Sequence, residues 1–358
     1  MRADGSERSL RLRRSRSRIP RSNLPLYGAI LAITALFSYF ALRHVQYAVA
    51  WRGLRNSDFL WLVPALAAFA LAMIARAFRW RSLFAPDRRP PLGAVSNAMM
   101  LGYLYNTILP ARSGEVARVM VLSRRSRAEP VEIAGTAVLE RLYDVVAILA
   151  IFFVAEPWLP SVSWLAPAAV AAGVLAAVIA ASALAMAFCG DAPVRLLLRP
   201  LRRLVRISDE RYERTVSELS YGLSGLRDPR VACEGFLWTI LAWMMTAVLA
   251  YLVSLAFRLH LPFACGVLVT AAVGLAMILP SPPAALGVFE GAALVALRVY
   301  GLSHSAALPY ALVLHLVTVL PFIVIGVGLL HYNSRHVPAQ TATGGIPGAA
   351  VARTGALP

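Results

Sequence analysis

Long apolar runs dominate the pattern of hydrophobic and polar positions along this chain. Most runs are about 18 to 25 residues long, which is the length that an α-helix needs to cross the hydrocarbon core of a bilayer. The short alternating segments that build outer-membrane barrels are absent from the pattern. The sequence therefore predicts an all-α fold, a polytopic bundle of membrane helices.

The runs predict about six full spans, at residues 24–42, 59–78, 136–154, 164–189, 235–257 and 306–330. Two further apolar stretches, 92–127 and 263–301, are interrupted by Pro, Gly and charged residues, and their arms are short. Arg-rich segments flank the first stretch on both sides, and both flanks should be cytoplasmic. We therefore expect two re-entrant broken hairpins, covered by protein or lining a watery cavity.

The spans and hairpins form two similar halves, at about residues 24–155 and 164–332. Ile-Leu-Pro occurs at 108–110 and again at 278–280, and a Gly and a Glu follow each copy. The first span would run outward and the fourth inward, so the halves would be inverted. In transporters built this way, paired broken helices meet at the bilayer midplane around a substrate site.

The polar segments predict the remaining organisation of the chain. Residues 1–23 are dense in Arg and should form a disordered cytoplasmic tail near anionic lipid. Residues 190–230 should form a cytoplasmic connector with one short interfacial helix preceded by a Ser208 cap, and 333–358 a second disordered tail. The expected location is the inner (cytoplasmic) membrane with a cytoplasmic N-terminus, although Arg43, Arg52 and Arg55 in the first outer loop oppose the positive-inside rule.

The amino-acid composition limits the kinds of site that this chain can contain. The chain is 59% hydrophobic and 15% charged, with a net charge of +17, and every basic side chain is Arg. The absence of Lys excludes a P-loop lysine and a Schiff-base lysine. In a membrane protein, a basic balance indicates topology and anionic lipid rather than nucleic acid. The three Cys and six His show no zinc or disulfide spacing, so we predict no metal or cofactor.

Charged residues inside apolar stretches are the candidates for function, because a charge at the bilayer centre costs roughly 2.5–3.5 kcal/mol. Arg112, Glu115 and Arg118 are three residues apart and would share a face of a helix. The two Arg could grip an anionic head group while Glu115 orients them or exchanges a proton. Alternatively, the three residues form a self-neutralising cluster that holds the hairpin.

Further charges lie near the start of the third span and in the second hairpin. Glu140 and Asp144 are one helical turn apart on the same face. Together with Arg141, they either mark the water interface or pair with the hairpin Arg. Glu290 has no basic neighbour within four residues, so it is either protonated or paired with Arg112 or Arg118.

These motifs resemble those of the lysylphosphatidylglycerol synthase transmembrane family of flippase-like proteins. The first family pattern is matched by Asn106, Leu109-Pro110, Arg112, Gly114-Glu115, Arg118 and then Glu140-Arg141-Leu-Tyr-Asp144. The second is matched by Pro280-Ser-Pro282 and by Gly287 and Glu290, with Pro283 and Ala284-Ala285 where the family has a Gly pair. The resemblance covers about residues 24–332.

The resemblance implies a lipid-translocating membrane domain. The expected substrate-binding residues are Asn106, Arg112, Glu115, Arg118, Glu140, Arg141, Asp144 and Glu290, and the expected hairpin breakers are Pro110, Gly114, Pro280, Pro282 and Gly287. The synthases of the family carry a soluble aminoacyl-transferase domain after the membrane part. About 28 residues follow Leu330 here, so we expect the translocating part without the enzyme.

The favoured function is therefore a lipid translocase that handles a polar lipid with an anionic or glycosylated head group. One alternative is an integral-membrane transferase that uses a polyprenyl-phosphate donor, with Glu115 or Asp144 as general base. The other is an accessory scaffold for enzymes of cell-envelope biosynthesis. The expected partners are membrane lipids, and envelope enzymes under the scaffold alternative.

Overall fold

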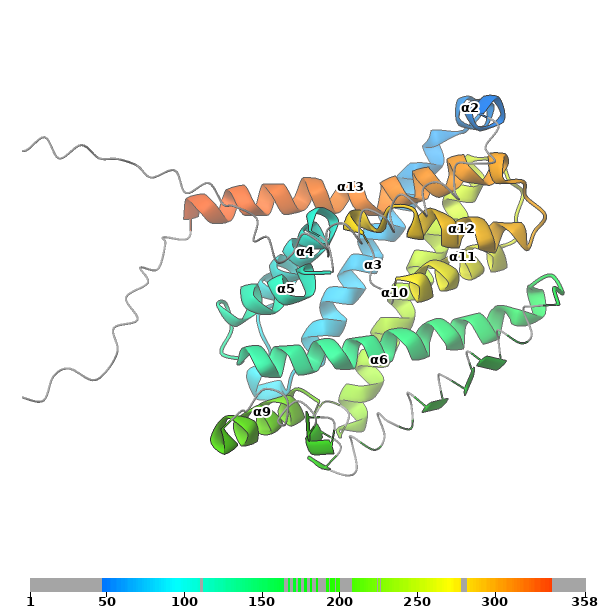
Figure 1. Cartoon of the computed structure of the whole chain (residues 1–358). Helices are drawn as coiled ribbons and strands as arrows, with labels where there is room; N and C mark the ends of the chain where they lie inside the picture. Colours follow the sequence, from blue (N-terminus) through cyan, green and yellow to red (C-terminus); the bar gives the residue numbers. More distant parts are fainter. Residues whose placement is uncertain are drawn as a thin grey trace, which may run out of the picture.

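The fold is known from a computed structural model, which describes residues 47–109, 112–163, 208–277 apart from 224 and 226, and 282–336, with isolated positions between 167 and 199. Every regular element among these residues is a helix (Figure 1). The all-α prediction is confirmed for this part of the chain.

Among the described residues, three helices are long and apolar enough to cross a membrane. They are the continuous segment Phe59–Ser82, formed by η2 (Phe59–Trp61) and α3 (Leu62–Ser82), then α10 (Pro229–Ala256) and the part of α13 (His304–His336) up to Asn333. They correspond to three of the predicted spans. The chain is thus a membrane protein.

The other predicted spans are less completely described. The third corresponds to α6 (Pro130–Ala155), whose 26 residues include charged side chains near its middle. The first, 24–42, lies outside the described residues, and the fourth, 164–189, is described only at isolated positions. The total of six spans stays a prediction, and so does the expected disorder of 1–23. Residues 333–336 belong to the end of α13 rather than to a tail.

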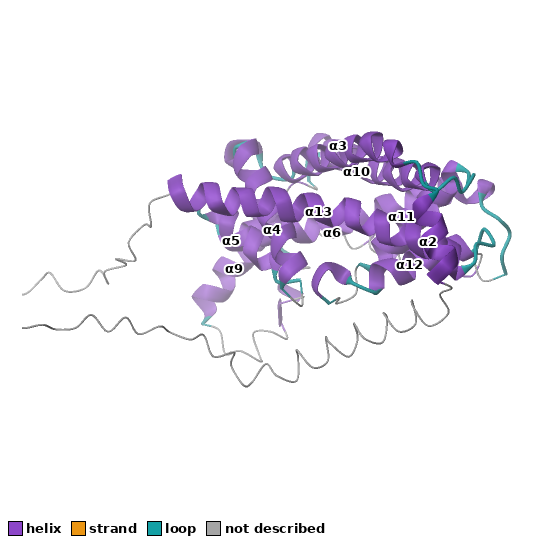
Figure 2. Ribbon diagram, turned by 90° about the horizontal axis from the view of Figure 1, so that it is seen from above, coloured by secondary structure: helices purple, strands orange, loops and turns teal. Residues whose placement is uncertain are grey.

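Helices α3 and α10 lie side by side and antiparallel (Figures 1 and 2). Near one end of the pair, the rings of Phe78 and Trp238 stack with centroids 5.1 Å apart. At the other end, the backbone N–H of Asp58 donates to the carbonyl of Ala256 at 2.8 Å. Helix α10 begins with Pro229 after Asp228, whose carboxylate caps the backbone N–H of Arg230 at 2.9 Å.

Two pairs of short helices occupy the space beside α3 and α10. The first pair is α4 (Leu92–Ile108) and α5 (Gly114–Ser123), and the second is α11 (Phe263–Ala276) and α12 (Val288–Arg298). The start of α4 and the end of α5 pack against Trp80 and Phe84, near the C-terminal end of α3. Helices α11 and α12 pack against the opposite end of the bundle. The turn between α4 and α5 (the first turn) and the turn between α11 and α12 (the second turn) both line one cavity, which lies between these two ends.

The order of elements repeats along the chain. A long helix, a pair of short helices and a second long helix appear as α3, α4–α5 and α6, and again as α10, α11–α12 and α13. Because α3 and α10 run in opposite directions, this order agrees with the predicted inverted repeat. The re-entrant placement of the two helix pairs relative to a bilayer stays a prediction.

The predicted short helix of the connector is α9 (Asp209–Gly222), and Ser208 occupies its N-cap position without a side-chain cap bond. The helix packs beneath α6, and a Cβ on Gly222 would lie 2.3 Å from the carbonyl oxygen of Glu132. Helix α2 (Tyr47–Arg55) packs on α13 at the other end of the bundle. The 3₁₀ turns η3 (Pro86–Arg88), η4 (Glu156–Trp158) and η6 (Pro283–Ala285) complete the fold.

Candidate functional site

A cavity of about 260 Å³ lies where the two turns meet. Its walls come from α3, α4, α6, α10 and α13 and from the turns of both helix pairs. Aromatic side chains form much of the apolar wall, and seven charged side chains also line the cavity: Arg76, Arg79, Arg112, Glu115, Glu140, Arg141 and Asp144. The cavity therefore joins most of the charges that sequence analysis singled out.

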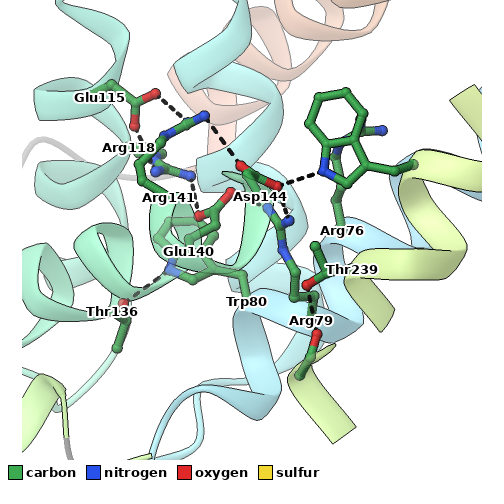
Figure 3. Close-up of polar contacts among 12 residues, drawn as sticks. Arg76, Arg79, Trp80, Glu115, Arg118, Thr136, Glu140, Arg141, Asp144 and Thr239 are labelled. Atoms are coloured by element: carbon green, nitrogen blue, oxygen red, sulfur yellow. Dashed lines mark hydrogen bonds and ion pairs between the residues drawn. The ribbon is translucent and has the colours of Figure 1, made fainter. Parts of the chain in front are cut away.

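Arg79 of α3 bridges two carboxylates of α6 (Figure 3). Its Nη1 contacts Asp144 Oδ1 at 2.5 Å, and its Nη2 pairs with Glu140. Glu140 and Asp144 thus share a helix face, as their spacing predicted. Arg79 itself is only 1% exposed, so this cation near the end of α3 points into the protein.

Arg118 and Arg141 complete the network (Figure 3). Arg118 contacts Glu140 Oε2 at 2.8 Å and Glu115 Oε2 at 2.6 Å, and its guanidinium lies over the Trp80 ring at 4.8 Å. Arg141 contacts Glu115 Oε1 at 2.7 Å and Asp144 Oδ2 at 3.3 Å.

Three guanidinium groups thus occupy all six oxygens of three carboxylates. The network is electrically neutral and ties α3, α5 and α6 together. Every carboxylate oxygen has a guanidinium partner, which is the condition under which buried charges are tolerated, whereas Arg79 Nε and Arg118 Nε are buried without a hydrogen-bond partner in the described part of the chain. Of the two readings of the hairpin charges, the self-neutralising cluster describes Glu115 and Arg118.

Two guanidinium groups of the cavity lie outside this network. Arg76 donates to the Thr246 hydroxyl at 3.1 Å and lies over the Trp243 ring at 5.2 Å. Arg112 sits in the turn before α5 with a φ of 53°, so it does not share a helix face with Glu115 and Arg118 as predicted. Neither Arg has a carboxylate partner among the described residues. Since the network of three guanidinium groups and three carboxylates is neutral, Arg76 and Arg112 add two positive charges at the cavity that these carboxylates do not balance.

Two motif residues build the first turn. The side-chain oxygen of Asn106 accepts a hydrogen bond from the backbone N–H of Gly114 at 2.8 Å, across the break between α4 and α5. A Cβ on Gly114 would lie 2.0 Å from the carbonyl oxygen of Gly102, so α5 approaches α4 too closely for a side chain. Gly114 therefore begins α5 rather than breaking a helix. Pro110 lies outside the described residues.

The second turn is built around Glu290, which is 4% exposed. Its Oε2 accepts from the backbone N–H of Gly287 at 2.7 Å, and its Oε1 lies 2.6 Å from His315 Nδ1. Of the two alternatives for Glu290, the pairing with Arg112 or Arg118 is wrong, because His315 of α13 is its partner instead. Gly287 has a φ of 79°, and Pro282 lies before η6 and lines the cavity. Pro280 lies outside the described residues.

The departure from the family pattern in this turn has a visible consequence. Ala284 and Ala285 adopt φ values of 53° and 57°. This left-handed region costs an L-residue roughly 1–2 kcal/mol and costs Gly very little. The family pattern has a Gly pair in this stretch. In this chain, Ala284 and Ala285 stand there, yet the backbone has the left-handed φ values that glycine adopts readily.

An apolar groove adjoins the charged cavity. A second hollow of about 400 Å³ shares six residues with the cavity, among them Arg112, Asp144 and Trp243. It continues along the side chains of Ala137, Val138, Val145 and Ile148 of α6 and along Gly274 of α11. Val138 is 46% exposed. The charged cavity is thus continuous with an apolar groove between α6 and α11.

Sequence analysis missed four charged or aromatic residues of this site, Arg76, Arg79, Trp243 and His315. Arg76 lies one turn before Arg79 on α3, and this spacing was a usable signal for a pair of inward-facing cations. Trp243 donates its indole N–H to Asp144 Oδ1 at 2.9 Å, and His315 lies inside a long apolar helix. A lone His or Trp in an apolar run carries no distinguishing pattern.

A model of the family described as Lysylphosphatidylglycerol synthase TM region matches residues 28–326. The match contains the charge network, the two surplus Arg, Glu290 and His315. A search of curated proteins found no match to the chain.

Proposed function

The chain belongs to the lysylphosphatidylglycerol synthase transmembrane family, and we propose that it is a lipid translocase that moves an anionic lipid head group across the membrane. The family and the apolar helices support a lipid-handling role. Translocation, the anionic head group and the site are the more specific parts of the proposal.

The observation that carries the proposal is a pair of guanidinium groups, Arg76 and Arg112, on the wall of one cavity, for which the described part of the chain supplies no carboxylate partner. A guanidinium binds phosphate or carboxylate through two parallel hydrogen bonds, and it keeps its charge in an apolar setting. A lipid phosphate would supply the negative charge that this wall lacks.

The neighbouring groups support this assignment. The Thr246 hydroxyl and the Trp243 ring hold the Arg76 guanidinium. The backbone of Arg112 directly precedes α5, which the ion pair between Arg118 and Glu140 joins to α6. A head group would thus meet one guanidinium held by its neighbours and a second on a turn beside an anchored helix.

The groove between α6 and α11 suits the rest of a lipid. Its lining past the charged residues is apolar, and acyl chains need an apolar surface. With the head group at Arg112, the chains would lie along Val138 and Ile148 and remain in contact with the bilayer. This arrangement avoids moving the chains through the charged cavity.

The transferase alternative needs a carboxylate that can accept a proton from a substrate. Both oxygens of Glu115 and both oxygens of Asp144 contact guanidinium groups, so neither carboxylate has a free oxygen to take a proton from a substrate. The scaffold alternative assigns no role to two surplus charges in a cavity. These points favour translocation.

We further propose that the protein lies in the inner membrane with the α9 end in the cytoplasm. Exposed Arg side chains gather at this end, among them Arg88, Arg124, Arg125 and Arg127, as the positive-inside rule requires. Membrane lipids are the proposed partners.

Transfer of fluorescent lipids in liposomes containing the purified protein would test the function. Labelled phosphatidylglycerol, phosphatidylcholine and an uncharged glycolipid would be compared by quenching of the outer leaflet. We expect phosphatidylglycerol to move fastest. Arg112→Gln and Arg76→Gln should each slow this transfer about 10- to 100-fold, the equivalent of one charge-assisted hydrogen bond.

Arg125→Gln provides a matched control, because Arg125 is exposed on the loop after α5 and should leave transfer unchanged. Folding of each variant would be checked by thermal unfolding. Equal transfer by wild type and both cavity variants would overturn the assignment of Arg76 and Arg112. A folded wild type that moves none of the three lipids would overturn translocation itself.

A further inference from the structure

The second turn contains a carboxylate and an imidazole that the binding of an anion does not use. Glu290 Oε1 and His315 Nδ1 lie 2.6 Å apart in the buried interior. The other ring nitrogen, His315 Nε2, lies 2.8 Å from the carbonyl oxygen of Ala284. The imidazole thus connects α12, α13 and the turn before α12.

The hydrogen-bond acceptors around the His315 ring indicate where one exchangeable proton is held. A carbonyl oxygen only accepts, so His315 Nε2 carries a hydrogen. A bare Nδ1 and a carboxylate oxygen would then face each other with lone pairs at 2.6 Å, unless a proton lies between them. One proton between these atoms makes the pair neutral, either as imidazolium with carboxylate or as imidazole with carboxylic acid.

The carboxylates of the opposite wall differ in this respect. Glu115, Glu140 and Asp144 are paired with guanidinium groups, which do not lose their protons in proteins. Glu290 is paired with a group that can release one. Among the described acids at the cavity, the Glu290–His315 pair is the place where a proton can be bound and released.

The pair is in contact with the cavity. His315 lines it directly, and the ring stacks on Phe289 with centroids 4.3 Å apart. The charged and titratable groups that line the same cavity are Arg76 and Arg79 of α3, Tyr103 of α4, Arg112 and Glu115 of the first turn and α5, and Glu140, Arg141 and Asp144 of α6. From α10, the cavity receives the uncharged side chains of Trp243, Thr246 and Leu249.

Loss of the proton would alter the turn. A neutral imidazole has one N–H and can donate to Ala284 or to Glu290, but not to both. Ala284 and Ala285 are in the left-handed conformation, which needs surrounding contacts to persist. Removal of one anchoring hydrogen bond therefore favours a different conformation of the second turn.

We propose that Glu290 and His315 form a proton-binding site that couples lipid translocation to proton movement. This inference rests on the translocation of an anionic lipid proposed above. The proton leaves to water in the cavity, and the pair then has a charge of −1. An anionic head group at Arg76 and Arg112 opposes this release, so proton and head group bind together and move in the same direction.

Proteoliposomes with an imposed pH difference test the coupling. The distribution of labelled phosphatidylglycerol between the leaflets would be measured with a difference of one pH unit and after an ionophore removes it. One proton per lipid predicts a shift of about tenfold in the distribution. A pH-sensitive dye inside the vesicles should also report proton entry when phosphatidylglycerol is transferred inward.

Glu290→Gln and His315→Gln are the informative variants, because an amide keeps hydrogen-bonding atoms but does not exchange a proton in this range. Both should abolish the response to the pH difference and the dye signal, whereas Arg125→Gln should keep both. A wild type that transfers lipid with no response to the pH difference would overturn the coupling and leave translocation intact. A folded wild type that transfers no lipid would overturn both.

Discussion

The two helix pairs present the cavity with similar turns that are held by different chemistry. In the first pair, the neutral amide of Asn106 caps Gly114, and the surrounding acids are paired with permanently charged Arg. In the second pair, the carboxylate of Glu290 caps Gly287 and is paired with His315. Two turns of similar geometry can therefore differ in the charged groups that hold them.

The difference assigns a fixed side and a titratable side to the cavity. The first side has a surplus of positive charge that does not change near neutral pH, because guanidinium groups remain protonated. The charge of the second side changes by one when a proton binds or leaves. Variants that remove a cation of the paired network should impair folding, whereas variants of Glu290 or His315 should change the response to pH.

The largest effect on stability is expected from Arg79→Ala. This change leaves Glu140 and Asp144 buried with one fewer cation between them, and removal of one partner from a buried ion pair costs about 3–5 kcal/mol. The free energy of unfolding would be measured by titration with SDS in mixed micelles, followed by circular dichroism. We expect a large loss or a failure to accumulate folded protein.

Two comparisons make the Arg79 result specific. Arg125→Ala removes an exposed Arg and should change the free energy of unfolding by less than about 0.5 kcal/mol. The double variant Arg79→Met with Asp144→Asn restores charge balance and should recover part of the loss. If Arg79→Ala were as stable as Arg125→Ala, the network would not hold the first helix pair.

A smaller effect is expected where backbone approach, rather than charge, holds the first turn. In Gly114→Ala, the new Cβ would meet the Gly102 carbonyl oxygen at 2.0 Å, and such overpacking costs about 1–3 kcal/mol. Gly93→Ala is the matched change in α4, because nothing lies within 4 Å of its Cβ. Gly93→Ala should be neutral or stabilising by up to about 1 kcal/mol.

Gly287→Ala extends this comparison to the second turn. Its expected cost of about 1–2 kcal/mol comes from the φ of 79°. All three glycine variants would be measured by the same unfolding titration. A Gly114→Ala protein as stable as Gly93→Ala would contradict the close approach of α5 to α4.

Sequence reasoning reached the helical class, the three apolar spans and the pairs of short helices, because the length of an apolar run and a Pro-rich break are local signals. It also placed Glu140 and Asp144 on one face, since helical spacing is local too. Each of these inferences needs only a few consecutive residues.

Local signals of this kind could not identify the partners of the charged residues. Arg79 and Glu140 are 61 positions apart in the chain, and Glu290 and His315 are 25 apart. Periodicity places a side chain on a face but does not identify the helix that the face meets. Arg112 was misplaced for a related reason, because its left-handed φ removed it from the helix that the three-residue spacing suggested.

The smallest effect is expected at Asn106, and it separates a structural role from a binding role in the first turn. Asn106→Ala removes the acceptor for the Gly114 N–H and should cost about 1 kcal/mol, the usual effect of losing a helix cap. Asn106→Asp keeps an acceptor oxygen at the start of α5, where the helix dipole favours a negative charge. In the unfolding titration, Asn106→Asp should therefore be more stable than Asn106→Ala.

The new carboxylate would also offset part of the surplus positive charge, so it should weaken transfer of phosphatidylglycerol more than Asn106→Ala does. If the alanine variant abolished transfer while it kept wild-type stability, Asn106 would instead contact the head group directly.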